Sequence, residues 1–243
     1  MSPFVSRLQL HLIASPILPE WRMIMDEEAL EADPDIVAAW VAGWALSRGA
    51  PPPVRAFGGF RVEVGLPDQK ARIVFPAASP RVRLAADATP ETNILLKVCA
   101  RPELVRSHLP ADWQIKPLSF MMTTDELVGA PYGLGEGYRV RREQESGGSS
   151  VQIFAADGEL AASGRVFFVA SDAIYDRIET HPAHRRRGLG QVVMRELGCL
   201  ALDHGACRGL LVATPDGRAL YNRLGWRLHA LYTTAARRAA DPG

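Results

Sequence analysis

Residues 185–190, with the sequence RRRGLG, combine positive charge with a permissive backbone. Gly188 and Gly190 have no Cβ that would keep a ligand away from the main chain. Hydrophobic residues at helical spacing follow, and the first turn of a helix offers unpaired N–H groups and the positive end of the helix dipole. Together with the arginines, these features predict a site for a ligand that carries phosphate groups.

Two histidines lie immediately before this loop. His181 and His184 could bind a metal ion, but no third ligand with zinc-like spacing lies near them in the sequence. We therefore expect solvated loop histidines and no metal. The arginines could also contact nucleic acid, but no second basic stripe with interleaved aromatic residues accompanies them. The sequence thus predicts no nucleic-acid partner.

The composition is that of an ordinary globular protein. The chain has 243 residues, which is enough for one large domain or two small ones. Hydrophobic residues make up 47% of it and charged residues 23%, and the net charge of +1 favours neither nucleic acid nor an anionic membrane as a partner. Its three cysteines lack metal-ligand spacing, which favours buried thiols in a reducing cytoplasm.

No segment predicts a membrane span. The most apolar stretch, residues 36–46, is too short to cross a bilayer and follows a helix-start signal. Residues 8–18 are mildly apolar, but Gln9, His11 and two prolines interrupt them, which is unlike the core of a signal peptide. We expect a cytoplasmic protein without a membrane partner.

Alternating strands and helices surround the basic loop in the C-terminal half. Hydrophobic periodicity predicts strands at residues 138–143, 151–156, 164–170, 173–180, 209–213 and 226–234. Helices are expected from Leu189 to near Gly205 and at residues 216–224. The basic loop therefore lies between a strand and a helix.

The N-terminal half also predicts a mixture of helices and strands. Helices are expected at residues 35–48 and 102–109, and strands or extended segments at 60–64, 71–75, 94–98 and 113–124. Residues 79–92 mix strand and loop signals, and the lead-in before Asp33 is weakly patterned. Glycines and a proline mark a linker at residues 129–137, which predicts two domains, residues 1–128 and 129–243.

Two segments share one order of elements. Residues 94–124 and 209–234 both predict a strand, a short helix and a strand that begins with tryptophan and contains Thr-Thr. Strand–helix–strand units are common, so the N-terminal half is either a degenerate copy or an unrelated accessory α/β domain. The first segment has no glycine loop before it, and Arg106 stands where the second has Tyr221. We therefore expect only the second segment to retain chemistry.

Three motifs in order resemble those of the GNAT acetyltransferase superfamily. Residues 185–190 match its Q/R-x-x-G-x-G/A loop, Thr180–Pro182 resembles its V-x-P element, and Leu220–Trp226 resembles its L-Y-x-x-L-G-F/W element. The match covers about residues 138–234. The resemblance implies an α/β fold with a mixed, largely antiparallel sheet flanked by helices, the GNAT acyl-CoA N-acyltransferase fold, in tandem with a degenerate N-terminal copy.

The resemblance implies acetyl-CoA as cosubstrate and a primary amine, in a small molecule or a peptide, as acceptor. Backbone amides of the loop would bind the CoA pyrophosphate, and the end of the preceding strand would direct an N–H group at the thioester oxygen, where negative charge develops. The residues assigned to cofactor binding are Ile178, Glu179, Thr180, Arg185, Arg186, Arg187, Gly188, Leu189, Gly190 and Gln191. No cysteine lies beside the loop, so the amine would attack directly in a ternary complex.

Three residues are candidates for proton transfer. Tyr221 resembles the family's general acid, which protonates the departing thiolate, although a core tyrosine on an amphipathic helix is the alternative. Asp176 is the first candidate for the general base and Glu179 the second, and either could instead form a structural ion pair. Strict alternation along the strand places Asp176 with Ile178 on one face and Glu179 on the other.

One feature departs from the family. Only residues 145–150 separate the strands between which family members carry two helices, and those helices wall the acceptor groove. We therefore predict that the N-terminal half supplies this wall. A non-catalytic acyl-CoA sensor with the same pocket is the rival function. The acceptor's identity and the oligomeric state are left open by the sequence.

Overall fold

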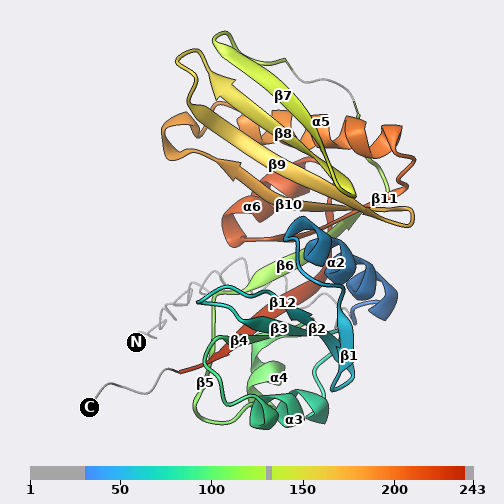
Figure 1. The fold of residues 1–243 in the computed structure, drawn as a ribbon, viewed down its shortest axis with the longest axis vertical. Coiled ribbons are helices and arrows are strands. Elements are labelled where there is room, and N and C mark those ends of the chain that lie inside the picture. The colour runs from blue at the N-terminus through green and yellow to red at the C-terminus, as the bar shows by residue number, and fades with distance from the viewer. Residues whose placement is uncertain (1–30, 130–132, 239–243) are drawn as a thin grey trace, which may run out of the picture. The chain divides into compact units, whose positions relative to one another are not determined.

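The computed structural model describes residues 31–129 and 133–238 (Figure 1). Most of the expected lead-in, including residues 8–18, lies outside these ranges, as do part of the predicted linker and the last residues of the chain. Within the described ranges, no helix is both long and apolar enough to cross a membrane.

Five helices and twelve strands follow one another along the described residues. The helices are α2 (Pro34–Ser47), α3 (Pro80–Ala88), α4 (Pro102–Ser107), α5 (Leu189–Asp203) and α6 (Pro215–Arg223), and η2 (Pro182–His184) is a 3-10 turn. The strands are β1 (Val54–Ala56), β2 (Gly59–Glu63), β3 (Ala71–Phe75), β4 (Ile94–Val98), β5 (Trp113–Ile115), β6 (Ser119–Thr124), β7 (Tyr138–Glu145), β8 (Gly148–Ala155), β9 (Leu160–Val169), β10 (Asp172–Thr180), β11 (Arg208–Ala213) and β12 (Arg227–Arg237).

The strands form one sheet in the order β1-β2-β3-β4-β12-β6-β11-β10-β9-β8-β7, with β5 paired to β12. Only β3–β4 and β10–β11 are parallel pairs, and the other pairs are antiparallel. The predicted fold class, a mixed and largely antiparallel sheet flanked by helices, is therefore confirmed. The sheet continues from β6 to β11 and β12, and the domain division at residue 128 stays a prediction.

Helices α2 and α5 cover opposite faces of the sheet around β10. Ile174 belongs to the hydrophobic cluster that contains α2, whereas its neighbour Tyr175 belongs to the cluster that contains α5. Successive residues of a strand point to opposite faces. A Cβ at Gly43 of α2 would lie 2.5 Å from Ile174 Cγ1, so glycine permits the close approach of α2 to β10.

Helix α2 begins and ends where the sequence predicts it. The Asp33 carboxylate accepts a hydrogen bond from the Asp35 N–H at 2.8 Å, and Pro34 occupies the first turn, where its missing N–H costs little. Gly49, with a φ of 62°, follows the last turn. Helix α2 packs on β9, β10 and β11, and its role as a wall of the acceptor groove stays a prediction.

Two expectations were wrong. Residues 79–92, expected to mix strand and loop, instead contain helix α3. Its buried residues Val82, Ala85 and Ala86 recur at helical spacing, but the charged residues between them obscure this pattern in the sequence. The cysteines were expected to be buried, yet only Cys99 is; Cys199 is half-buried and Cys207 is exposed.

The repeated order of elements is present in the structure. The unit β3-α3-β4-α4-β5 parallels β10-α5-β11-α6-β12, and in each unit the first two strands are parallel. The units differ in how far these strands stay together: β3 and β4 pair over residues 71–75, whereas β10 and β11 pair only over residues 172–174. The two parallel strands therefore separate in the second unit, whereas those of the first unit stay paired.

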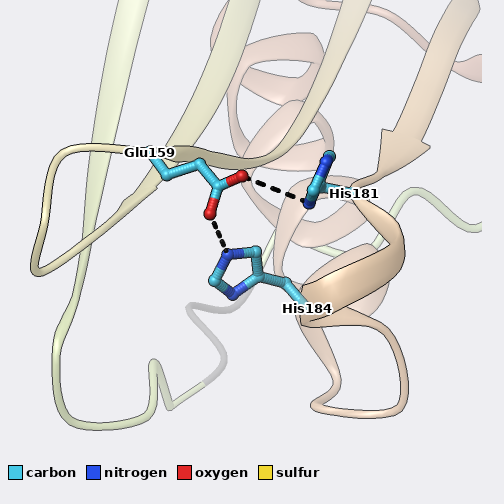
Figure 2. A group of neighbouring side chains, drawn as sticks. All are labelled: Glu159, His181 and His184. Carbon is cyan, nitrogen blue, oxygen red and sulfur yellow. Dashed lines mark hydrogen bonds and ion pairs between the residues drawn. The ribbon is translucent and has the colours of Figure 1, made fainter.

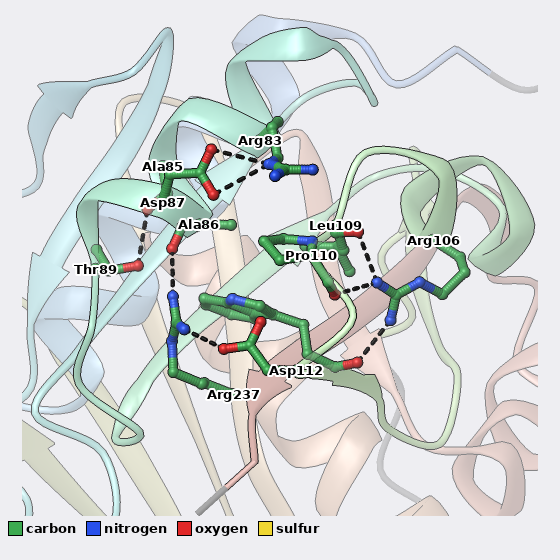
Figure 3. A network of polar contacts seen from close by, with 11 residues as sticks. Arg83, Ala85, Ala86, Asp87, Thr89, Arg106, Leu109, Pro110, Asp112 and Arg237 are labelled. Atoms are coloured by element: carbon green, nitrogen blue, oxygen red, sulfur yellow. Dashed lines mark hydrogen bonds and ion pairs between the residues drawn. The ribbon is translucent and has the colours of Figure 1, made fainter.

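Arg106 stands in the first unit where the second unit has Tyr221. Its side chain binds backbone carbonyl groups of the following connection (Figure 3). Its guanidinium donates hydrogen bonds to the carbonyl oxygens of Trp113 at 2.6 Å, Leu109 at 2.7 Å, and Pro110. These bonds fix the connection between α4 and β5. The connection between β3 and α3, residues 76–79, contains no glycine. The first unit thus has neither the phenol nor the glycine loop of the second.

Candidate active site

A pocket of about 1220 Å³ opens where β10 and β11 separate. Every residue assigned to cofactor binding lines it except Arg187. The assigned residues therefore form one contiguous surface in the structure. The end of β10, the basic loop and the first turn of α5 contribute to it.

The N-terminus of α5 presents free N–H groups to this pocket. Gly188 precedes the helix with a φ of 78°, and no side chain caps the first turn or places an acid in it. Only the N–H groups of Gln191 and Val192 return to the Gly188 carbonyl, at 3.0 and 3.2 Å. Within the described residues, the amides of residues 186–190 have no hydrogen-bond acceptor. Such a helix end is a ready site for a phosphate group.

The three arginines of the loop point in different directions. Arg185 lines the pocket and donates from Nε to the Thr180 carbonyl at 3.4 Å. Arg186, whose φ is 63°, also lines the pocket. Arg187 instead donates from Nη1 to the Tyr138 hydroxyl at 2.9 Å. Two of the three loop arginines that the sequence assigns to the ligand site therefore line the pocket.

A β-bulge changes the faces of β10. Asp176 pairs with Arg165 and Glu179 pairs with Ser163, so two residues of β10 oppose one residue of β9 between them. Arg177 has a φ of 53° at this irregularity. The strict alternation expected from the sequence was wrong, because the extra residue reverses the faces: Asp176 and Glu179 share one face.

Ile178 follows the same correction. It packs in the cluster that contains Tyr175 and α5, not with Ile174 and Asp176. Gly164 of β9 makes room for it, since a Cβ there would lie 2.7 Å from Ile178 Cδ1. The bulge therefore places the partly buried Ile178 on the α5 side, where it lines the pocket, and leaves the neighbouring carboxylates on the α2 side.

The Asp176 carboxylate is held by the end of α2. Ser47 Oγ donates to Oδ2 at 2.6 Å, and Arg48 Nη2 donates to Oδ1 at 3.0 Å. Arg48 Nε lies 2.9 Å from Oδ2. The Asp176 side chain is 14% exposed and does not line the pocket. Its contacts occupy both carboxylate oxygens.

Glu179 has a different environment. It is exposed and lines the pocket, and within the described chain its carboxylate has no hydrogen-bond or ion-pair partner. Of the two candidate bases, the structure brings Glu179 to the pocket and engages Asp176 elsewhere.

Tyr221 lies in α6 and is 7% exposed. Burial raises the pKa of its phenol to about 12, and the nearby Asp176 charge adds to the shift. The ring lies behind the pocket wall: Gly217 lines the pocket, and a Cβ there would lie 3.1 Å from Tyr221 Cε2. At neutral pH the hydroxyl therefore carries its proton.

Helix α6 contributes pocket residues that the sequence prediction missed. Thr214, which precedes α6, and Asp216, Gly217, Leu220 and Arg223 along it line the pocket. Leu220 and Arg223 belong to the motif around Tyr221, so this motif carried the signal. The Thr214 hydroxyl accepts a bond from the Gly217 N–H at 3.2 Å, which caps α6.

The comparisons with known proteins agree with this geometry. Residues 149–228 match the family described as acetyltransferase (GNAT) domain. The chain is similar to the solved structure of a GCN5-related N-acetyltransferase from Kribbella flavida, with a TM-score of 0.62 and 15% identity over 86% of this chain and 96% of that one. No curated protein matches the chain.

Two further solved structures have the same fold. A putative acetyltransferase from the GNAT family of Novosphingobium aromaticivorans DSM 12444 has a TM-score of 0.55 and 16% identity over 85% of this chain and all of that one, 100%. A GCN5-related N-acetyltransferase from Sphaerobacter thermophilus has a TM-score of 0.51 and 14% identity over 88% of this chain and 96% of that one. The chain thus has the GNAT fold, and its residues 149–228, which contain the parted strands and the basic loop, match the GNAT acetyltransferase domain family.

Proposed function

We propose that the chain is an N-acetyltransferase that moves the acetyl group of acetyl-CoA to a primary amine by direct attack in a ternary complex. The observation that carries this proposal is the uncapped N-terminus of α5, which opens into the pocket beside β10 and β11. The free amides of residues 186–190 would bind the CoA pyrophosphate. Arg185 and Arg186 would add charge-assisted hydrogen bonds.

The end of β10 would position the thioester. Ile178, Glu179 and Thr180 line the pocket at the end of β10, beyond residues 172–174, where β10 pairs with β11. A backbone N–H freed from the ladder can donate to the thioester oxygen. Negative charge grows on this oxygen as the amine attacks, so the bond strengthens in the transition state.

Tyr221 would serve as the general acid. The amine nitrogen forms a bond to the acetyl carbon, the carbon–sulfur bond breaks, and CoA leaves as a thiolate that accepts the phenol proton. The raised pKa keeps this proton in place until the thiolate forms. Tyr221 does not line the pocket itself, but its ring lies against Gly217, which does.

The contacts of the two carboxylates reverse our order of preference for the base. Glu179 lines the pocket without a partner among the described residues, so it can accept a proton from the acceptor's ammonium group, directly or through water. Asp176, bound by Ser47 and Arg48, would instead orient the α2 side of the site. Both carboxylates face α2, where we place the acceptor, a small-molecule or peptide amine.

This assignment gives the halves of the chain different roles. Residues 129–243 would carry catalysis, and residues 1–128 would be a degenerate GNAT-like copy that contributes α2 as a wall. The unparted β3 and β4, together with Arg106 at the position of Tyr221, support a loss of chemistry in the first copy. We place the enzyme in the cytoplasm, without nucleic-acid or membrane partners.

A non-catalytic acyl-CoA sensor is the second candidate. The observation that favours it is the occupied Asp176 carboxylate, which leaves one acid rather than two free at the pocket. The candidates are separated by calorimetric titration with CoA and by thiol release from acetyl-CoA across a panel of amines. An enzyme binds CoA and releases thiol with at least one amine, whereas a sensor binds CoA and releases none.

A further inference from the structure

Glu159, His181 and His184 converge beside the basic loop (Figure 2). Glu159 lies in the turn between β8 and β9, His181 precedes the turn η2, and His184 is its last residue. Glu159 Oε1 lies 3.4 Å from His181 Nδ1, and Oε2 lies 3.1 Å from His184 Nε2. One ligand atom from each of the three side chains lies within 4.8 Å of the others.

The donor set has the chemistry of a transition-metal site. Two imidazole nitrogens and one carboxylate are a common protein ligand set for Zn²⁺, which takes a water or another ligand in its fourth position. The sequence shows the two histidines but not the third ligand, because Glu159 lies 22 residues before His181. The third ligand comes from the preceding hairpin, which β9 and β10 bring alongside.

His184 is held as a metal-binding histidine is usually held. Its side chain is only 10% exposed, and Nδ1 lies 2.9 Å from the Tyr138 hydroxyl. That hydroxyl also accepts a bond from Arg187 at 2.9 Å. With a metal on Nε2, the ring proton resides on Nδ1 and is donated to the hydroxyl oxygen, which has a second lone pair. Such an outer partner fixes both ring orientation and tautomer.

His181 lacks a comparable bond. His181 Nδ1 lies close to the Glu159 carboxylate but forms no hydrogen bond with it. His184, by contrast, is hydrogen-bonded to Glu159. A neutral imidazole that turns its lone pair toward a carboxylate is repelled by it. A cation between the groups would reverse this, because both the nitrogen and the carboxylate oxygen would then bind it.

We propose that Glu159, His181 and His184 bind a Zn²⁺ ion that ties the β8–β9 turn to the basic loop. His181 and Pro182 line the pocket, so the ion would hold that end of the loop in place and add positive charge beside it. The proposal concerns a second site, and its test involves no CoA, so it stands or fails separately from the proposed function.

The test is a calorimetric titration of the tag-free full chain, stripped with a chelator, with Zn²⁺. We expect saturable binding of one ion per chain. The exposed ligands allow variants that keep the fold: Glu159→Gln and His181→Asn should each weaken binding at least about ten-fold. His108→Gln, which removes a histidine far from the cluster in sequence, should bind like the unaltered chain. Titration with Co²⁺ should produce the visible absorption of a tetrahedral site, and neither cluster variant should show it.

Tyr138→Phe provides a finer test, because it removes the outer partner of His184 and keeps all three proposed ligands. Binding should weaken about ten-fold while the tetrahedral Co²⁺ spectrum remains. Thermal unfolding in the presence of chelator checks that each variant is folded. Absence of saturable binding, or equal binding by Glu159→Gln, His181→Asn and the unaltered chain, overturns the proposal and leaves an imidazole–carboxylate ion pair only.

Discussion

Arg48 Nε lies 2.9 Å from Asp176 Oδ2 and joins the end of α2 to strand β10. Both side chains are mostly buried, with 28% and 14% exposed. The same carboxylate accepts a hydrogen bond from Ser47. The pair therefore attaches a helix of the N-terminal half to the strand whose end lines the candidate active site.

Removing Arg48 should destabilise the protein. Arg48→Ala leaves the Asp176 carboxylate partly buried with Ser47 as its remaining partner, and should lower the free energy of unfolding by about 1–3 kcal/mol. Urea unfolding measures this. Arg83→Ala, which breaks an exposed pair with Asp87, should cost under about 1 kcal/mol. An equal decrease in the free energy of unfolding in the two variants would show that the partly buried pair stabilises the protein no more than the exposed one.

Tyr221→Phe should reduce kcat by about 100-fold or more and should change the pH dependence of stability. The folded protein holds the phenol proton to a pKa of about 12, above the ordinary value of 10.0. The unaltered chain therefore loses stability as pH rises through this window, while below it the phenol contributes fully. The Phe variant should lack the part of the stability loss at alkaline pH that comes from this phenol. Parallel stability curves for the two proteins above pH 10 would contradict the shift.

Lys97 predicts a pH effect of a different origin. Burial, with a smaller contribution from the Arg72 charge, lowers its pKa from 10.5 to about 7. Between these values the unfolded chain binds a proton that the folded chain has lost, so stability rises with pH across the window and is lowest below it. Lys97→Met should raise stability near neutral pH by about 1 kcal/mol or more and flatten this rise. Lys70→Met, at an exposed ion pair, should leave the slope unchanged.

Gly188→Ala tests the loop itself. The φ of 78° at Gly188 is strained for a residue with a Cβ, at a cost of about 1–2 kcal/mol, so the amides that face the pocket should shift. We expect the CoA affinity to fall about ten-fold or more in a calorimetric titration. Gly205→Ala is the matched control: it has a φ of 83° just beyond the other end of α5, with no atom within 4 Å of the added Cβ. It should lose stability but keep CoA affinity, and an equal loss of affinity in both variants would contradict the role of the loop.

Local patterns in the sequence were sufficient for most of the elements and for the loop. Helix α2 carries a capping aspartate, an early proline and a terminal glycine, and the strands around the basic loop alternate or are uniformly apolar. The residues that the GNAT motifs assign to cofactor binding line the pocket except for Arg187, and their role stays a prediction. That side chain is engaged by Tyr138, a contact between strand β7 and the loop that no local pattern contains.

The failures have physical causes at identifiable residues. Helix α3 has a narrow apolar stripe among charged residues, so the tertiary packing of Val82, Ala85 and Ala86 determines it more than its pattern does. The bulge at Arg177 inserts one residue and reverses every face prediction beyond it. Glu159 contacts the histidines, and Ser47 contacts Asp176, because the folded sheet brings distant segments together. Residue spacing in the sequence does not predict such contacts.

The most direct test of the central claim is acetyl transfer itself. Acetyl-CoA labelled in its acetyl group is incubated with the protein and a panel of amines, and labelled amide and free CoA thiol are both quantified. We predict that at least one amine gains the label in equal amounts with thiol release, and that Tyr221→Phe slows both about 100-fold. Tight CoA binding without labelled product from any amine would contradict the enzyme and favour the sensor. Label transfer unaffected by Tyr221→Phe would contradict the assigned acid.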